Sequence, residues 1–144
     1  MKIEIKHIKG AKNEIYNDAV NIRKQVFVVE QKIDKHLEID ENENIASYIV
    51  VYADGLAVST GRYRETKEGI KMERFATLPA FRGKGMGRIV LKEILKYILP
   101  LNKQIYLNSQ DSATGFYLKN GFTISGEPFY EAGIKHYRML YSEK

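Results

Sequence analysis

The sequence predicts an α+β, or mixed α/β, domain arranged around one sheet. Residues 2–8 and most of residues 46–78 read as strands, with alternating or continuous apolar runs between turn signals. Residues 13–30 and 89–98 instead carry apolar side chains at helical spacing. The resulting order is β-α-β-β-β-α-β-α-β-β, and 144 residues suit a single domain spanning 1–144.

The N-terminal half is predicted to contain one helix and four strands. The run "KIEIKHI" alternates as a strand does, and a helix follows from Asn13 to about Glu30. Residues 32–44 are polar and acidic, so we expect a loop there and call it the acidic loop. The remaining strands are predicted at 46–53, 56–64 and 70–78, divided by the Asp54-Gly55 turn and by residues 65–69, and ended by Pro79.

The C-terminal half is predicted to alternate helices and short strands. A helix follows the glycines at 83–87 and ends near Pro100. A strand is expected at 104–109 and a short helix at 111–120, with Gly121 as its C-terminal stop. The segments "FTISGE" and "IKHYRMLY" are predicted as the last two strands.

Composition excludes several classes of function. The chain has no cysteine, which excludes disulfides, thiolate zinc sites and covalent cysteine catalysis, and which suits a cytoplasmic protein. No apolar run is long enough to span a membrane, and the charged, alternating N-terminus does not resemble a signal peptide. We therefore expect no membrane association and no bound metal.

Charge is unevenly distributed along the chain. Residues 61–103 carry 11 Lys or Arg against 4 Glu, and residues 29–44 carry 6 Asp or Glu against 2 Lys. The basic stretch favours an anionic partner, nucleic acid included, although a solvated basic face is an equal explanation. The acidic stretch is either a rim that attracts cations or an ordinary solvated loop.

The segment "RGKGMGR", residues 82–88, places glycines and cations between a strand and a helix. Bare backbone amides at a helix N-terminus form an anion site suited to phosphate or pyrophosphate. A tight turn with solvated cations is the alternative. The P-loop pattern fails because Arg88 and Ile89 follow Gly87, and the dinucleotide fingerprint fails because the spacing is G-x-G-x-G with no acid in residues 100–110.

A third pattern fits these residues. "RGKGMG" resembles the Arg/Gln-x-x-Gly-x-Gly/Ala loop of the GNAT acetyltransferase superfamily, and "FYLKNGF" at 116–122 resembles that family's last helix and the start of its next strand. The segments "VFVVEQ", "LNSQ" and "FYEAGIKHYRM" narrow the resemblance to the ElaA-like, or YjcF-like, branch across nearly the whole chain. The resemblance implies a GNAT-like acyl-CoA N-acyltransferase fold. Its sheet has six or seven mostly antiparallel strands flanked by helices, and strands 72–78 and 104–109 splay apart.

The resemblance also implies where acetyl-CoA binds. The cofactor would lie in the gap between the splayed strands and pair with the exposed backbone of residues 76–78, while residues 82–88 hold its pyrophosphate. Gln110 stands where the family has an asparagine, and it would bond the pantetheine arm or cap the helix. The implied cofactor-binding residues are Ala76, Thr77, Leu78, Arg82, Gly83, Lys84, Gly85, Met86, Gly87, Arg88, Gln110 and Phe116.

The implied reaction is direct attack of a primary amine on acetyl-CoA in a ternary complex. Tyr117 matches the family tyrosine that protonates the departing thiolate, with a core tyrosine as the alternative. Phe116 lies about 100° away around the helix, so one ring should face the core and the other the cleft. Ile105 replaces the glutamate that some members use as base. Other members place the base on the strand before the loop, which implies Glu73, with a salt bridge to an arginine as an equal explanation. His136 is also weighed as a base, against a structural role on the last strand.

The acceptor side of the site would be formed by the first helix, the loop after it and the last strands. The implied acceptor-binding residues are Phe27, Glu30, Gln31 and His136. Polyamine-like amines, lysine side chains and protein N-termini all remain open as acceptors. A non-catalytic CoA-binding or sensing module is the alternative function, and a homodimer is one open assembly. A nucleic-acid binder is disfavoured because no nucleic-acid motif accompanies the basic stretch, and we expect no such partner.

Overall fold

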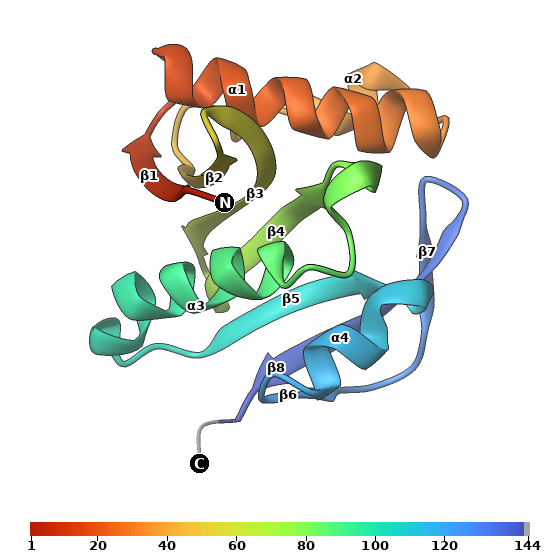
Figure 1. Cartoon of the computed structure of the whole chain (residues 1–144). Coiled ribbons are helices and arrows are strands. Elements are labelled where there is room, and N and C mark those ends of the chain that lie inside the picture. Colours follow the sequence, from red (N-terminus) through yellow and green to blue (C-terminus); the bar gives the residue numbers. More distant parts are fainter. Residues whose placement is uncertain (143–144) are drawn as a thin grey trace.

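Eight strands form one sheet in the computed structural model, which describes residues 1–142 (Figure 1). The strand order is β1-β2-β3-β4-β5-β8-β6, with β7 paired to β8, and every pairing is antiparallel except that of β4 with β5. The mixed architecture is as predicted, but the expected count of six or seven strands was too low. The strands are β1 Ile3–Lys9, β2 Ser47–Ala53, β3 Leu56–Thr66, β4 Gly69–Thr77, β5 Ile105–Gln110, β6 Phe122–Ile124, β7 Phe129–Glu131 and β8 Ile134–Tyr141.

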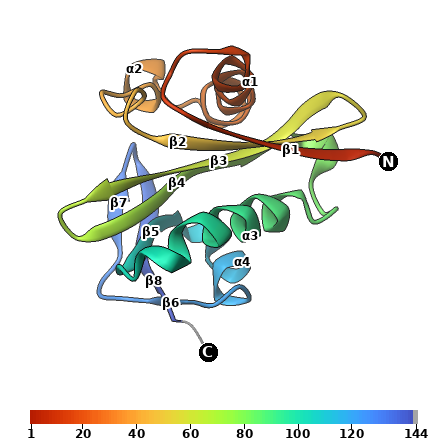
Figure 2. The same cartoon turned by 90° about the vertical axis from the view of Figure 1, so that its left-hand side faces the viewer.

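Helices cover both faces of the sheet (Figure 2). The predicted first helix is confirmed as α1, Glu14–Arg23, which continues in wider π-helical turns as η1, Lys24–Glu30. Its start is set by Asn13, whose side-chain oxygen accepts hydrogen bonds from the next helical amides, those of Ile15 and Tyr16. The other helices are α2 Lys35–Glu38, α3 Met86–Ile98 and α4 Thr114–Leu118, with short 3₁₀ turns η2 Pro79–Phe81, η3 Leu99–Leu101 and η4 Asp111–Ala113.

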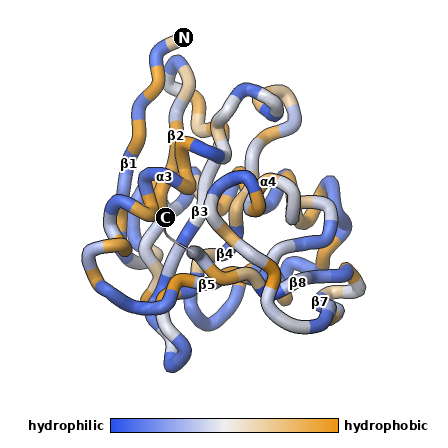
Figure 3. The backbone as a smooth tube through the Cα atoms, turned by 90° about the horizontal axis from the view of Figure 1, so that it is seen from below, coloured by the Kyte–Doolittle hydropathy of each residue, from blue (hydrophilic) through white to orange (hydrophobic). Residues whose placement is uncertain are grey.

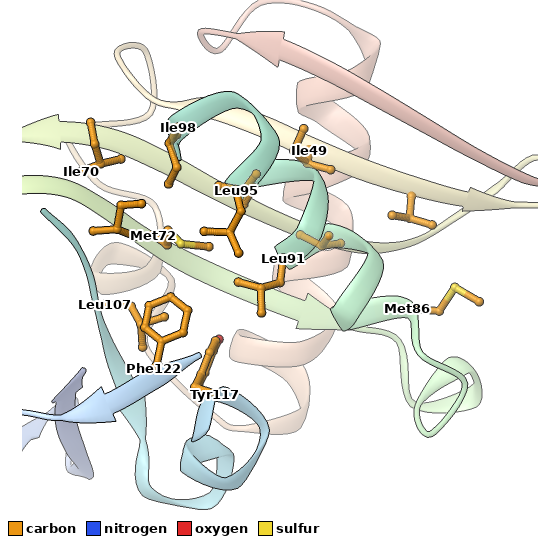
Figure 4. Close-up of a cluster of buried hydrophobic side chains, with 14 of the residues drawn as sticks. Ile49, Ile70, Met72, Met86, Leu91, Leu95, Ile98, Leu107, Tyr117 and Phe122 are labelled. Atoms are coloured by element: carbon orange, nitrogen blue, oxygen red, sulfur yellow. The ribbon is translucent and has the colours of Figure 1, made fainter. Parts of the chain in front are cut away.

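The sheet separates two hydrophobic cores. Successive residues of β2 point to opposite faces, so Ile49 and Val51 pack in the α3 core while Tyr48 and Val50 pack in the α1 core. Both faces of β2 are therefore buried, and the hydropathy colouring shows a hydrophobic stretch at β2 (Figure 3). The α3 core extends to Tyr117 and Phe122, which lie below Leu91 in Figure 4. In residues 1–142, no helix is long and apolar enough to cross a membrane.

Strands β4 and β5 pair only where both begin. Ile70, Lys71 and Met72 face residues 105–107, and beyond Met72 the two strands have no paired residues. The β3–β4 register shifts at the same place, and Arg74 adopts a left-handed φ of 58° there. This bulge turns β4 away from β5, which confirms the predicted splay.

The last strands differ from the prediction in one respect. The segment "FTISGE" pairs only over β6, Phe122–Ile124, and an additional strand, β7, forms a hairpin with β8. Ala132 and Gly133, with φ of 51° and 74°, make the two-residue turn that such a hairpin requires. Alternation of polarity did not reveal β7, because the strand is only three residues long.

Gly61 lies opposite the β4 bulge and allows α3 to approach the sheet closely. A Cβ atom at this position would lie 2.8 Å from Val90 Cγ1 and 3.3 Å from Ile94 Cδ1. Gly61→Ala is therefore expected to destabilise the protein by about 1–3 kcal/mol, the usual cost of overpacking a core. Urea denaturation measures this loss. Gly115→Ala is the control, because a Cβ there meets no atom within 4 Å, and equal stability of the two variants would contradict the prediction.

Candidate active site

A cavity of about 890 Å³ opens where β4 leaves β5. Its walls come from the two strands, η1, the loop before α3, α4 and the β7–β8 hairpin. The structure brings nearly all of the predicted site residues to this cavity, and only Leu78 and Lys84 lie outside its lining. The predicted residues that line it are Phe27, Glu30, Gln31, Glu73, Ala76, Thr77, Arg82, Gly83, Gly85, Met86, Gly87, Arg88, Gln110, Phe116, Tyr117 and His136.

The glycine loop ends in the N-terminus of α3, a helix of 13 residues. Gly83 and Gly85 have φ of 75° and 80°, a backbone conformation that residues other than glycine rarely adopt. Gly85 is the N-cap residue of α3. The first turn of α3 contains no acidic residue, and Arg88 is exposed at the cavity. Open amides, the helix dipole and an exposed cation are the features that an anion such as a phosphate favours.

Fewer backbone amides of β4 face the cavity than the prediction for residues 76–78 requires. The Leu78 amide donates to the Val58 carbonyl of β3 at 2.9 Å, so it cannot face the cavity. Amides alternate direction along a strand, so the Thr77 amide points to the open edge. The predicted use of the Leu78 amide toward a ligand is therefore wrong, because its direction is fixed by pairing with β3. Thr77 is left as the open backbone donor.

Two contacts tie η1 to the two walls of the cavity. Arg82 donates to both carboxylate oxygens of Glu30, at 2.6 and 2.7 Å, and its Nε donates to the Thr77 carbonyl at 3.0 Å. The hydrogen bonds from Arg82 hold the pKa of Glu30 below its usual value. On the other side, Gln31 and Gln110 exchange hydrogen bonds through their amides, at 2.9 and 3.1 Å. These geometries favour Arg82 as a loop anchor and show that Gln110 does not cap α4.

Tyr117 and Phe116 both border the cavity, contrary to the prediction that their positions on the helix would separate them. Their rings make an edge contact with centroids 5.0 Å apart. Neighbouring residues of α4 point about 100° apart, and the cavity borders enough of the helix surface to meet both. Tyr117 also packs edge-on against Phe75 and Phe122, and Figure 4 shows its ring standing between α4 and α3. Burial raises the pKa of its phenol above the usual value, so the hydroxyl keeps its proton.

Glu73 is committed to cations, which argues against its predicted role as base. Its carboxylate contacts Arg62 at 2.6 Å, Arg64 at 2.8 Å and Lys71 at 3.4 Å. Burial by itself would raise the pKa of Glu73, but the nearby cations outweigh burial and lower the pKa to about 2. A carboxylate that binds protons so weakly is a poor base near neutral pH. The salt-bridge interpretation therefore fits the structure better.

Three acids of the acidic loop, Glu38, Asp40 and Glu43, pair with arginines, while Asp34 and Glu41 are exposed. Glu38 and Glu43 are buried, and both bind Arg23, which is only 1% exposed. Glu43 also contacts Arg62, and Arg74 of the β4 bulge bonds Asp40 and the Glu38 carbonyl. Burial would raise the pKa of Glu43, but Arg23 and Arg62 hold it well below its usual range. The prediction treated these acids by their charge alone and missed the arginines that neutralise them.

The cavity residues that were not predicted as site residues include four charged ones: Glu38, Lys71, Arg74 and Glu131. The Glu38 Oε1 atom is buried and has no hydrogen-bond partner among the described residues. Glu131 Oε1 lies 3.9 Å from Nε2 of His136 across the hairpin. Only the Ala132-Gly133 turn could have indicated this last pairing, since a two-residue turn brings Glu131 and His136 to one end of the hairpin.

The fold and this cavity define a class: transferases of the acyl-CoA N-acyltransferase type. Residues 11–142 match the Acetyltransferase (GNAT) domain family, and the chain belongs to that family. It is 40% identical over 134 residues to the uncharacterized N-acetyltransferase YjcF of Bacillus subtilis (strain 168), covering 90% of this chain and 95% of that one.

Two crystal structures share the fold. Escherichia coli ElaA superposes with a TM-score of 0.86 at 23% identity, over 98% of this chain and 100% of that one. An acyl-CoA N-acyltransferase from Pseudomonas aeruginosa superposes with a TM-score of 0.85 at 22% identity, over the same shares of the two chains. The resemblance to the ElaA-like and YjcF-like branch is therefore confirmed.

The charge of Glu73 predicts a specific loss of stability in acid. The pKa of Glu73 is about 2 in the folded protein, against 4.5 for an ordinary glutamate carboxyl, so its ion pairs stabilise the fold above pH 4.5 and fade as the pH falls toward 2. The shift corresponds to about 3 kcal/mol. Glu73→Gln should thus be much less stable than wild type at neutral pH, and the difference should shrink below about pH 5.

Urea denaturation at a series of pH values measures this difference. Glu127→Gln, at an exposed position, is the matched control and should follow the wild type throughout. A gap between wild type and Glu73→Gln that stays constant from neutral pH into acid would show that the Glu73 charge does not stabilise the fold.

Proposed function

We propose that this chain is an N-acetyltransferase that moves an acetyl group from acetyl-CoA to a primary amine by direct attack in a ternary complex. The observation that carries the proposal is the cavity between β4 and β5, which joins an open strand edge to an anion site at the N-terminus of α3. An elongated ligand with a diphosphate at one end and a thioester at the other fits these two features. Membership of the GNAT family supports the same class of reaction.

The cofactor would bind along β4. The Thr77 amide would donate a hydrogen bond to the ligand chain, which would accept it as the carbonyl of a neighbouring strand does. The amides of residues 85–88 would hold the pyrophosphate. Arg88 and Lys84 are exposed cations beside this loop and would neutralise the phosphate charge. Ala76, Met86, Gly87 and Phe116 supply the closely packed surface around these donors.

The chemistry needs a neutral amine and a protonated leaving thiolate. In this proposal the amine attacks the thioester carbon, the C–N bond forms, and the C–S bond breaks with its electron pair on sulfur. Tyr117 gives its phenolic proton to that sulfur and regains one from solvent. Burial keeps the phenol protonated, and the same burial raises the proton affinity of a thiolate that forms beside it.

A non-catalytic CoA-binding module on the same fold is the second candidate. It would use the same loop and strand edge, and it differs only in having no acceptor and no proton donor. The two candidates separate in one assay, because consumption of acetyl-CoA across a panel of amines, polyamines and peptides requires catalysis, whereas CoA retention does not.

Binding of acetyl-CoA is predicted to fail in Gly87→Glu. A Cβ at Gly87 would already lie 3.6 Å from the Phe116 ring, and the added carboxylate would enter the anion site. Calorimetry should therefore detect no CoA binding to this variant. Gly115→Glu introduces the same charge at an exposed position of α4 and should bind CoA like the wild type. Unchanged CoA affinity in a folded Gly87→Glu protein would refute the cofactor site.

Tyr117→Phe is predicted to slow acetyl transfer by about 10²–10⁴-fold, the usual contribution of general acid catalysis. The ring contacts with Phe75 and Phe122 remain in this variant, so CoA affinity should stay the same. Both kcat and CoA affinity are measured. Tyr106→Phe, which removes a hydroxyl bonded to Thr66 outside the cavity, should keep wild-type kcat. A wild-type rate for Tyr117→Phe, with chemistry limiting, would leave Tyr117 a purely structural role.

A further inference from the structure

The β7–β8 hairpin presents a histidine and a glutamate to the cavity. Phe129 pairs with His136 and Glu131 with Ile134, so the two-residue turn holds Glu131 and His136 at one end of the hairpin. Both residues line the cavity. His136 is 8% exposed and stacks on Phe129 with ring centroids 5.7 Å apart, which fixes the plane of its ring.

The contacts of His136 decide which of its nitrogens is free. Its Nδ1 lies 2.7 Å from the Ile134 carbonyl oxygen, and a carbonyl can only accept a hydrogen bond. The neutral ring therefore carries its proton on Nδ1, which leaves a lone pair on Nε2. Within residues 1–142, Nε2 makes no hydrogen bond, and the carboxylate of Glu131 lies 3.9 Å from it.

Two acceptors thus face each other at the cavity with no donor between them. A lone pair and a carboxylate at 3.9 Å repel each other until a donor or a positive charge joins them. A primary ammonium has three N–H donors and one positive charge, so it can bond to both groups at once. An anionic ligand, or one with acceptors only, would be repelled by both groups. The pair therefore suits the protonated form of a primary amine.

The other charged groups near His136 do not supply that donor. Lys135 and Tyr137 are its neighbours on β8, and successive residues of a strand point to opposite faces. Gln110, its partner on β5, is neutral and bonds to Gln31. Asp111, on η4 beside β8, interacts with Lys135, whose pKa is raised by its hydrogen bond to Tyr137 and by the charge of Asp111. Glu131 of β7 is the carboxylate that contacts the His136 ring.

Resting on the acetyl transfer proposed above, we propose that His136 is the general base for the acceptor amine and that Glu131 holds the ammonium against it. The ammonium gives one proton to Nε2, which leaves a neutral amine and an imidazolium balanced by the Glu131 carboxylate. The amine attacks the thioester carbon, sulfur leaves with the C–S electron pair, and Tyr117 protonates it. The nitrogen loses its second proton to solvent, where His136 also releases the first.

Other carboxylates at the cavity are less available. Glu30 is bound on both oxygens by Arg82, and Glu73 is bound by three cations. Glu38 is the rival, because its Oε2 binds Arg23 and Arg74 while its Oε1 has no partner among the described residues. Glu38→Gln therefore belongs in the same experiment as the alternative base.

His136→Asn is the suitable variant, because the asparagine amide can still donate to the Ile134 carbonyl while the Nε2 lone pair is lost. We measure acetyl transfer at saturating acetyl-CoA with primary amines that range from weakly to strongly basic, across neutral and alkaline pH. A general base matters most when the amine is protonated. For a strongly basic alkylamine, the rate of acetyl transfer by the variant should fall by about 10²–10⁴-fold at neutral pH. The rate should recover as the pH rises and the amine loses its proton. Weakly basic amines should be little affected.

Two further variants complete the test. Glu131→Gln should raise KM for ammonium acceptors and leave CoA affinity unchanged. His36→Asn, at an exposed position outside the cavity, should keep wild-type rates with every amine. An equal loss for all amines in His136→Asn would overturn its role as base. The proposal also fails if Glu38→Gln, and not His136→Asn, shows the dependence on amine basicity.

Binding is read without turnover by following the His136 ring signals in NMR spectra during titration with an alkylammonium ion. The wild-type signals should shift, and Glu131→Gln should abolish the shift. If the ammonium binds in this way but no amine is acetylated, the ammonium site stands and the proposed transferase function fails. If transfer occurs but the ring signals do not respond to the ammonium ion, the Glu131–His136 pair is not the acceptor site.

Discussion

The separation of β4 from β5 is the constraint on which the rest of the site depends. The two strands pair over three residues and then part at the bulge where Arg74 has a left-handed backbone. A parallel pair that continued to the strand ends would close the cavity and use the Thr77 amide in the sheet. The bulge gives up those ladder bonds and costs the strain of a non-glycine residue at positive φ, which the surrounding structure must offset.

The compensation comes from a buried network of charges. Arg74 bonds the acidic loop, whose acids also bind Arg23 and Arg62, and Arg62 in turn binds Glu73 just before the bulge. Breaking a buried pair by removing one partner typically costs about 3–5 kcal/mol, because the remaining charge is left uncompensated. The network thus holds the bulge, α1 and the acidic loop in a single arrangement. It also lowers the basicity of Glu73, which moves the search for a base to the opposite wall of the cavity.

The opposite wall is formed by short elements that the sheet positions. The five residues of α4 place Tyr117 against the cavity, and the β7–β8 turn places Glu131 beside His136. These walls are linked to η1 through Gln31, which bonds Gln110. Proposed acid and proposed base thus come from separate elements on the β5 side, while the open donor of the strand edge belongs to β4. A substrate between them would meet proton-transfer groups on one wall and backbone donors on the other.

The sequence by itself determined the glycine loop, the family and the element order apart from the short α2 and β7, because those features depend on local periodicity, turn chemistry and residue spacing. It also located most of the cavity lining, since the loop and the Tyr117 helix lie at fixed distances from recognisable strands. Only the tertiary structure decided the direction of the Leu78 amide and the pairing of Glu73 with Arg62, which join residues on different strands. The same holds for the buried acids of the acidic loop and for the lone pair of His136. Burial and hydrogen-bond or ion-pair partners set the availability of a charged or polar group. Both depend on residues that are distant in the sequence, so the local sequence does not reveal them.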